Sequence, residues 1–119
     1  MSFDLYQELI LEHASHPLHK GALTTPSKVV PAKNSSCGDT FVLQLQIKDN
    51  VITEVGWTGA GCAVSTASMS VVSDMLVGKT LPQAKKIDKQ AIVDALGLQD
   101  IMLSRERCAF LPLRALQEL

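Results

Sequence analysis

The spacing of apolar residues changes once in the middle of this chain, and that change limits which folds the chain can adopt. From Phe41 to Ile47 apolar and polar residues alternate, and a second β-rich run follows at 51–57, after the turn pair Asp49-Asn50. Gly59-Ala60-Gly61 then ends the strand, and from Cys62 to about Val77 apolar residues recur at helical spacing. The pattern predicts an antiparallel hairpin that leads directly into a helix.

Start and stop signals place the remaining elements around this hairpin. We expect a helix over 3–14 that Pro17 stops, and a third strand over 28–30. The helix after the hairpin should end at Gly78. Beyond it we expect a short helix that begins with a capping box at Thr80, another from Asp88 to Gly97, and a last helix whose start Pro112 delays to Leu111 or beyond. We therefore expect an α+β fold in one domain over residues 1–119. It should consist of a three-stranded antiparallel sheet packed against several helices.

Composition excludes several functional classes. Hydrophobic residues make up 46% of the chain and aromatic ones 4%, so the core must be mainly aliphatic. A net charge of −1 gives no basic footprint for nucleic acid, and no apolar run reaches the roughly 18 residues that cross a bilayer. The chain starts without a secretion signal, which predicts a cytoplasmic protein with reduced thiols. Its three cysteines cannot form a complete set of disulfides.

Cys37 and Asp39 flank a glycine in the turn that enters the first hairpin strand. In an extended backbone residues two apart point the same way, and a thiolate beside a carboxylate needs a positive charge between them. One interpretation is therefore a metal site. The other is a turn in which Asp39 binds local amides and Cys37 points inward, which these residues alone favour.

Cys62 follows Gly59-Ala60-Gly61 at the start of the predicted helix. Unpaired N–H groups at a helix N-terminus stabilise a thiolate and lower its pKa. The residues at 63–68 are mostly small, which either leaves room for a bound group or allows close packing of helix and sheet.

Cys108 directly follows a basic stretch that contains Arg105 and Arg107. Guanidinium groups favour the thiolate and can hold a persulfide through charge-assisted hydrogen bonds. The alternative is a solvated helix start with Cys108 packed beneath it.

Taken together, Cys-Gly-Asp at 37–39, Gly-x-Gly-Cys at 59–62 and Cys108 in a basic context resemble the iron–sulfur cluster scaffold family of IscU, the NifU N-terminal domain and SufU. The opening segment 6–21 is similar to that family as well. The resemblance implies that the three cysteines meet at one end of the fold.

The same resemblance implies functional roles. Cys37, Cys62 and Cys108 would be thiolate ligands. Asp39 would be a fourth ligand or would control release of the cluster. The site would hold zinc, iron or a [2Fe–2S] cluster. Sulfur would come from a cysteine desulfurase of the SufS or IscS type, with Cys108 as persulfide acceptor and Arg105 supporting it, and acceptor apo-proteins would receive the product.

The subtype stays open. IscU proteins carry histidine where this chain has Arg107, and Arg105 matches SufU proteins instead. The interval from Cys62 to Cys108 is, however, too short for the insertion that SufU proteins carry there.

Two other functions are compatible with parts of the sequence. One is a small structural zinc-binding module without sulfur transfer. The other is a cysteine hydrolase in which Cys62 is the nucleophile and His13, His16 or His19 the base. We expect these histidines to be structural or surface residues, because Pro17 breaks the helix that would align them.

Overall fold

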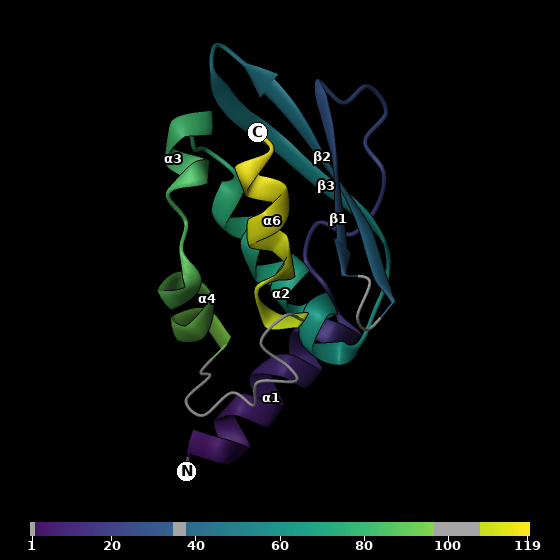
Figure 1. The fold of residues 1–119 in the computed structure, drawn as a ribbon, viewed down its shortest axis with the longest axis vertical. Coiled ribbons are helices and arrows are strands. Elements are labelled where there is room, and N and C mark those ends of the chain that lie inside the picture. The colour runs from purple at the N-terminus through teal and green to yellow at the C-terminus, as the bar shows by residue number, and fades with distance from the viewer. Residues whose placement is uncertain (1, 35–37, 97–107) are drawn as a thin grey trace.

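The computed structural model describes residues 2–34, 38–96 and 108–119, and it places the helices against one face of a three-stranded sheet (Figure 1). The elements are α1 (Ser2–Ser15), β1 (Lys28–Asn34), β2 (Asp39–Lys48), β3 (Val51–Ala60), α2 (Ala63–Leu76), α3 (Leu81–Lys85), α4 (Lys89–Leu96) and α6 (Leu111–Gln117). Helices α2 and α6 lie next to the sheet, with α3 and α4 beyond them. The predicted α+β class and three-stranded antiparallel sheet are confirmed.

The sheet has the order β1-β2-β3, and both pairs are antiparallel. Asp49 and Asn50 have φ values of 54° and 67°, as a two-residue hairpin turn of type I′ requires. β3 ends within the predicted stretch Gly59-Ala60-Gly61, because Gly59 still pairs with Phe41 and the strand continues to Ala60. Gly59 has a φ of 121°, and a Cβ there would lie 2.2 Å from the Thr40 carbonyl oxygen. This glycine therefore lets two strands approach closely instead of ending one.

Helix α2 is buried on nearly every side. The predicted apolar stripe lies in the core, including Ala67 and Val72. Four serines of α2 are also buried, which apolar spacing did not predict: Ser65, Ser68, Ser70 and Ser73. Their small side chains allow α1, α4, α6 and the sheet to pack around one central helix.

The predicted helix ends are largely confirmed. Cys62 is the N-cap of α2, and Gly78 follows its C-cap with a φ of 88°. The capping box joins Thr80 and Gln83, while the Asp88 carboxylate accepts a hydrogen bond from the Ala91 N–H at 3.1 Å. Pro112 lies in the first turn of α6, which begins at Leu111 as expected. The expected stop at Gly97 lies outside the described residues.

The loop after α1 is fastened to α2 and β3 by hydrogen bonds. Ser70 Oγ accepts from the Leu18 N–H and lies within hydrogen-bond distance of His13 Nδ1, both at 2.8 Å. The Leu18 carbonyl accepts from Trp57 Nε1 at 2.8 Å and from Ser73 Oγ at 3.2 Å. We call this set of contacts the loop clasp.

The three histidines are structural or surface residues, as predicted. His13 belongs to the loop clasp, and His19 Nε2 lies 3.0 Å from Asp74 Oδ1. His16 is exposed. Over the described ranges, no helix is long and apolar enough to cross a membrane.

Two serines of α2 give a matched test of the loop clasp. Ser70→Ala should lower the free energy of unfolding by about 1–3 kcal/mol, because it leaves the Leu18 N–H without its acceptor. Ser68 is equally buried, yet its Oγ has no hydrogen-bond partner among the described residues, so Ser68→Ala should be neutral or stabilising. Urea unfolding of both variants measures the difference, and equal losses would contradict the role given to Ser70.

Candidate metal centre

Three of the four predicted ligands converge. Asp39 is the first residue of β2, Cys62 caps α2, and Cys108 lies in a helical turn just before α6. One ligand atom from each lies within 4.8 Å of the others. These element ends meet at the end of the sheet nearest α1 (Figure 1). The fourth predicted ligand, Cys37, lies outside the described residues.

Strand pairing explains why Asp39 reaches Cys62. Thr40 pairs with Ala60, so Asp39 is one residue before this pair and Cys62 is two residues after it. The buried carboxylate uses Oδ1 to accept a hydrogen bond from the Cys62 N–H at 3.1 Å, and its Oδ2 lies 3.9 Å from Cys62 Sγ. Asp39 thus binds a segment distant in sequence. Gly38, which the sequence places in the turn before Asp39, has a φ of 72°.

The Cys62 thiol lies in surroundings that favour the thiolate. Its Sγ accepts from the Ser65 N–H at 3.5 Å and lies 3.5 Å from Ser65 Oγ. Burial, the largest single influence, raises the pKa of Cys62, while hydrogen bonds with the Ser65 hydroxyl and from the Ser65 N–H lower it. A hydrogen bond with Cys108 also lowers this pKa, while the charge of Asp39 raises it. The net pKa of Cys62 is below its usual value.

The small residues after Cys62 serve mainly for packing. Ser65, Ala67 and Ser68 are fully buried, which supports the second of the two interpretations for these positions. Sequence reasoning treated Ser65 only as a small residue and missed its contact with Cys62. The signal was its position, because the third helical residue is the one that an N-cap side chain binds.

The donor set fits a thiophilic metal ion. Zinc binds carboxylate oxygens at about 2.0–2.2 Å and thiolates at about 2.3 Å, which places a neighbouring oxygen and sulfur about 3.6 Å apart around a tetrahedral ion. The spacing of 3.9 Å between Asp39 Oδ2 and Cys62 Sγ is already close to that value. Two thiolates and a carboxylate so close together repel one another, and a cation between them removes that cost. Asp39, Cys62 and Cys108 could therefore hold a metal ion.

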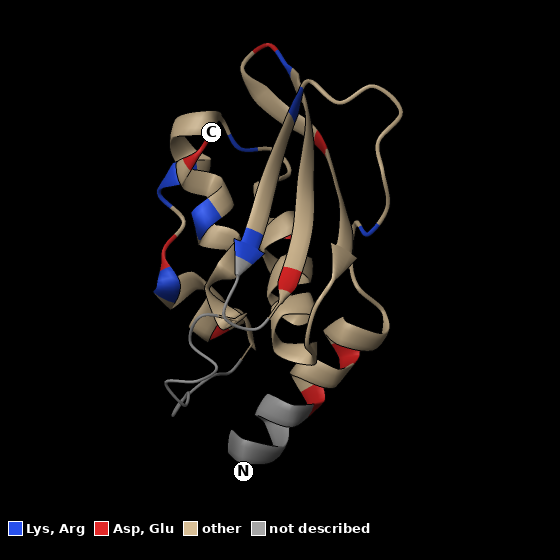
Figure 2. Ribbon diagram, turned by 45° about the vertical axis from the view of Figure 1, so that its right-hand side comes forward, with Lys and Arg blue, Asp and Glu red and all other residues tan. Residues whose placement is uncertain are grey.

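The supporting cations predicted near Cys108 cannot be placed, because Arg105 and Arg107 lie outside the described residues. Acidic and basic residues are otherwise interspersed over the described elements (Figure 2). Cys108 itself is only 2% exposed, and Cys62 is partly exposed. Of these two cysteines, Cys62 is therefore the more accessible.

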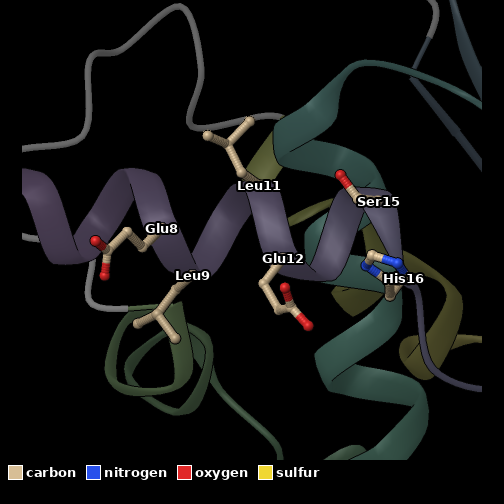
Figure 3. A pocket seen from close by; sticks show the side chains of 6 residues that line it. All are labelled: Glu8, Leu9, Leu11, Glu12, Ser15 and His16. Atoms are coloured by element: carbon tan, nitrogen blue, oxygen red, sulfur yellow. The ribbon is translucent and has the colours of Figure 1, made fainter.

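A groove of about 560 Å³ runs along α1, separate from these ligands. Figure 3 shows the side chains that line it: Glu8, Leu9, Leu11, Glu12, Ser15 and His16. None of the three converging ligands contributes to this groove.

Comparison with known proteins gives the same picture from the sequence. The family model described as the NifU-like N terminal domain matches residues 5–118. The iron–sulfur cluster assembly scaffold protein IscU 1 of Archaeoglobus fulgidus is 31% identical over 78% of this chain, and the match spans 61% of that relative's length. The zinc-dependent sulfurtransferase SufU of Bacillus subtilis is 28% identical over 96% of this chain and 88% of its own.

Solved structures agree on the fold. The crystal structure of a putative iron–sulfur cluster assembly scaffold protein for the SUF system from Fervidobacterium islandicum has a TM-score of 0.81 and 26% identity. The alignment covers 99% of this chain and 98% of that one. The chain belongs to the NifU-like N terminal domain family, the family of the IscU and SufU iron–sulfur cluster assembly proteins.

Proposed function

We propose that this chain is an iron–sulfur cluster assembly protein that accepts sulfur from a cysteine desulfurase at a Cys₃Asp metal site. The observation that carries the proposal is the convergence of Asp39, Cys62 and Cys108 within 4.8 Å. Cys37 is the proposed fourth ligand, because it is two residues before Asp39 in the sequence. Membership in a family that contains IscU and SufU proteins supports the same function.

The proposed donor set suits temporary holding of a metal. Thiolates bind zinc and iron well, whereas a carboxylate is a harder and weaker ligand for such metals. Asp39 is therefore the ligand that exchanges most readily. An exchangeable position lets sulfide, iron or an acceptor protein enter, and a closed site with four cysteines would hold its contents more firmly.

Sulfur acceptance is the second part of the proposal. A thiolate of this chain attacks the outer sulfur of the desulfurase persulfide, takes that sulfur and releases the desulfurase cysteine as a thiolate. Cys108 is the proposed acceptor and Arg105 its supporting cation. The greater exposure and lowered pKa of Cys62 make it the alternative acceptor.

The proposal covers both occupants that the family suggests. Zinc and a [2Fe–2S] cluster would use the same ligands, as relatives named scaffold protein and zinc-dependent sulfurtransferase suggest. Acceptor apo-proteins would take the product, and the cytoplasm, where thiols stay reduced, would be the compartment. Desulfurase assays with zinc-loaded and with cluster-loaded protein separate the two roles.

The alternative, a small structural zinc-binding module, makes a different demand on the fold. Such modules unfold without metal. Here the buried core includes Phe41, Leu43 and Trp57 on the sheet and Leu76 near the far end of α2. This core is built by side chains that are not metal ligands, so the fold should persist without an ion.

Metal analysis tests the site directly. The purified protein should bind about one zinc ion or one [2Fe–2S] cluster per chain. Cys62→Ser and Cys108→Ser should each weaken zinc binding by more than the roughly 10- to 100-fold that loss of an outer-shell partner costs. Removal of zinc with a chelator should leave the circular dichroism spectrum unchanged. Unfolding on chelation would favour the structural module, and absence of any bound metal would reject the site.

The Ser65 contact predicts a pH effect on the thiol. In metal-free protein Cys62 should react with iodoacetamide at a lower pH than an ordinary cysteine, because its lowered pKa keeps the thiolate populated. Ser65→Ala removes the side-chain hydrogen bond that lowers the pKa of Cys62, while the Ser65 N–H stays, and it should shift the rate profile to higher pH. Mass spectrometry of the Cys62 peptide measures the rate. Ser68→Ala serves as the control, and an unchanged midpoint in Ser65→Ala would contradict the contact.

Sulfur acceptance separates the two described cysteines. After incubation with a cysteine desulfurase and free cysteine, a persulfide should form on Cys108 and be lost in Cys108→Ser. Cys62→Ser should keep it. Persulfide labelling followed by peptide mass spectrometry reads both variants. Label retained in Cys108→Ser but lost in Cys62→Ser would move the acceptor role to the more exposed cysteine.

A further inference from the structure

Gly61 lies next to both Asp39 and Ser65 at the candidate metal centre. It joins Ala60, the last residue of β3, to Cys62, the N-cap of α2. A Cβ at this position would lie 2.7 Å from Asp39 Oδ1 and 2.5 Å from Ser65 Oγ. Separations under 3.0 Å are essentially never found around a real Cβ atom, so any side chain here would displace the carboxylate, the hydroxyl or both.

The need for glycine at this position concerns space and not backbone conformation. Among the described glycines, those with positive φ are Gly21, Gly38, Gly59 and Gly78, and Gly61 does not belong to this group. Alanine could adopt the backbone angles of Gly61 without strain. The consequence of a Cβ would therefore fall on the groups it meets.

The space that Gly61 leaves fixes which oxygen of Asp39 faces the thiol. Oδ1 is held by the Cys62 N–H at 3.1 Å, and Oδ2 lies 3.9 Å from Cys62 Sγ. A carboxylate with one oxygen held by a backbone amide can offer the other oxygen to a metal while keeping that hydrogen bond. The hydrogen bond takes one of the two lone pairs of Oδ1 and weakens that oxygen as a ligand, so Oδ2 is the favoured donor to a metal.

We propose that Gly61 is a positioning residue that makes Asp39 a one-oxygen ligand, by leaving room for the carboxylate to dock on the Cys62 amide. The inference rests on the metal site of the proposed function and specifies how its weakest ligand binds. A carboxylate with one oxygen held by an amide presents its other oxygen to the metal in a fixed direction. A single metal–oxygen bond of this kind is easily replaced by another ligand. That combination suits a ligand that must give way to incoming sulfur or to an acceptor.

The test is a mutant cycle with metal-binding readouts. Gly61→Ala should weaken zinc binding by roughly 10- to 100-fold, the usual cost of losing an outer-shell partner. In an Asp39→Ala background the same substitution should cost much less, because only the Ser65 hydroxyl is left for the Cβ to displace. In a Ser65→Ala background it should still weaken binding, because the contact with Asp39 Oδ1 remains. Ala63→Ser, which adds one atom to an exposed neighbour of Cys62, is the matched control.

Two spectroscopic readouts separate positioning from general destabilisation. Cobalt in the wild-type site should show the intense visible bands of a four-coordinate centre, and Gly61→Ala should alter them. In metal-free ¹⁵N-labelled protein, Gly61→Ala should speed hydrogen exchange at the Cys62 amide, which loses its carboxylate acceptor. Exchange at core amides of α2 should stay the same.

Three outcomes would overturn the inference. They are wild-type zinc affinity in Gly61→Ala, an equal loss in the Asp39→Ala background, and unchanged exchange at the Cys62 amide. Failure of the proposed function looks different. The wild-type protein would then bind neither zinc nor cobalt, which rejects Asp39 as a ligand, while the amide exchange still reports whether Gly61 lets the carboxylate dock.

Discussion

The pairing of β2 with β3 at the end away from their turn is the constraint on which the candidate centre depends. It sets Thr40 opposite Ala60, and so brings Asp39 beside the segment that turns into α2. The hydrogen bond from the Cys62 N–H to Asp39 then ties the strand to the helix start. A shift of one residue in this register would turn the Asp39 side chain to the other face of the sheet. Secondary structure therefore positions two of the ligands before any metal binds.

Burial of α2 supplies the second half of this arrangement. A helix surrounded by the sheet, α1, α4 and α6 has little freedom to tilt, so its N-cap is held in place. The hydroxyl groups of its buried serines do different work along its length. Ser65 faces the Cys62 thiol, while Ser70 and Ser73 fasten the loop that follows α1. The N-terminal end of α2 thus belongs to the candidate metal centre, and its middle holds the loop after α1 in place.

Local signals in the sequence predicted the elements better than the contacts between them. The start of α2 after Cys62, the capping box at Thr80 and the proline-delayed start at Leu111 depend on neighbouring residues, and the structure has all three. The close approach of a second strand at Gly59 was not predicted, because it depends on residues far away in the sequence.

The same reason limits what the sequence reveals about the site. The contacts around Gly61 and Ser65 form only when the residues around position 39 pack against those at 61–65. No local sequence pattern predicts that packing. Apolar spacing likewise could not predict the buried serines, because it counts only apolar side chains. The convergence of Asp39, Cys62 and Cys108 agrees with the resemblance on which they were chosen. The roles of Cys37 and Arg105 stay predictions.

The loop clasp also determines what the protein shows optically. Trp57 is the single tryptophan of the chain, and it is fully buried with its ring edge-on to Phe41 at a centroid distance of 5.6 Å. Its indole N–H binds Leu18, and the Lys20 ammonium lies 5.7 Å from the ring centroid. Its fluorescence therefore reports on the contact between the loop after α1 and the sheet. Release of that loop would expose the indole to water and shift its emission to the red.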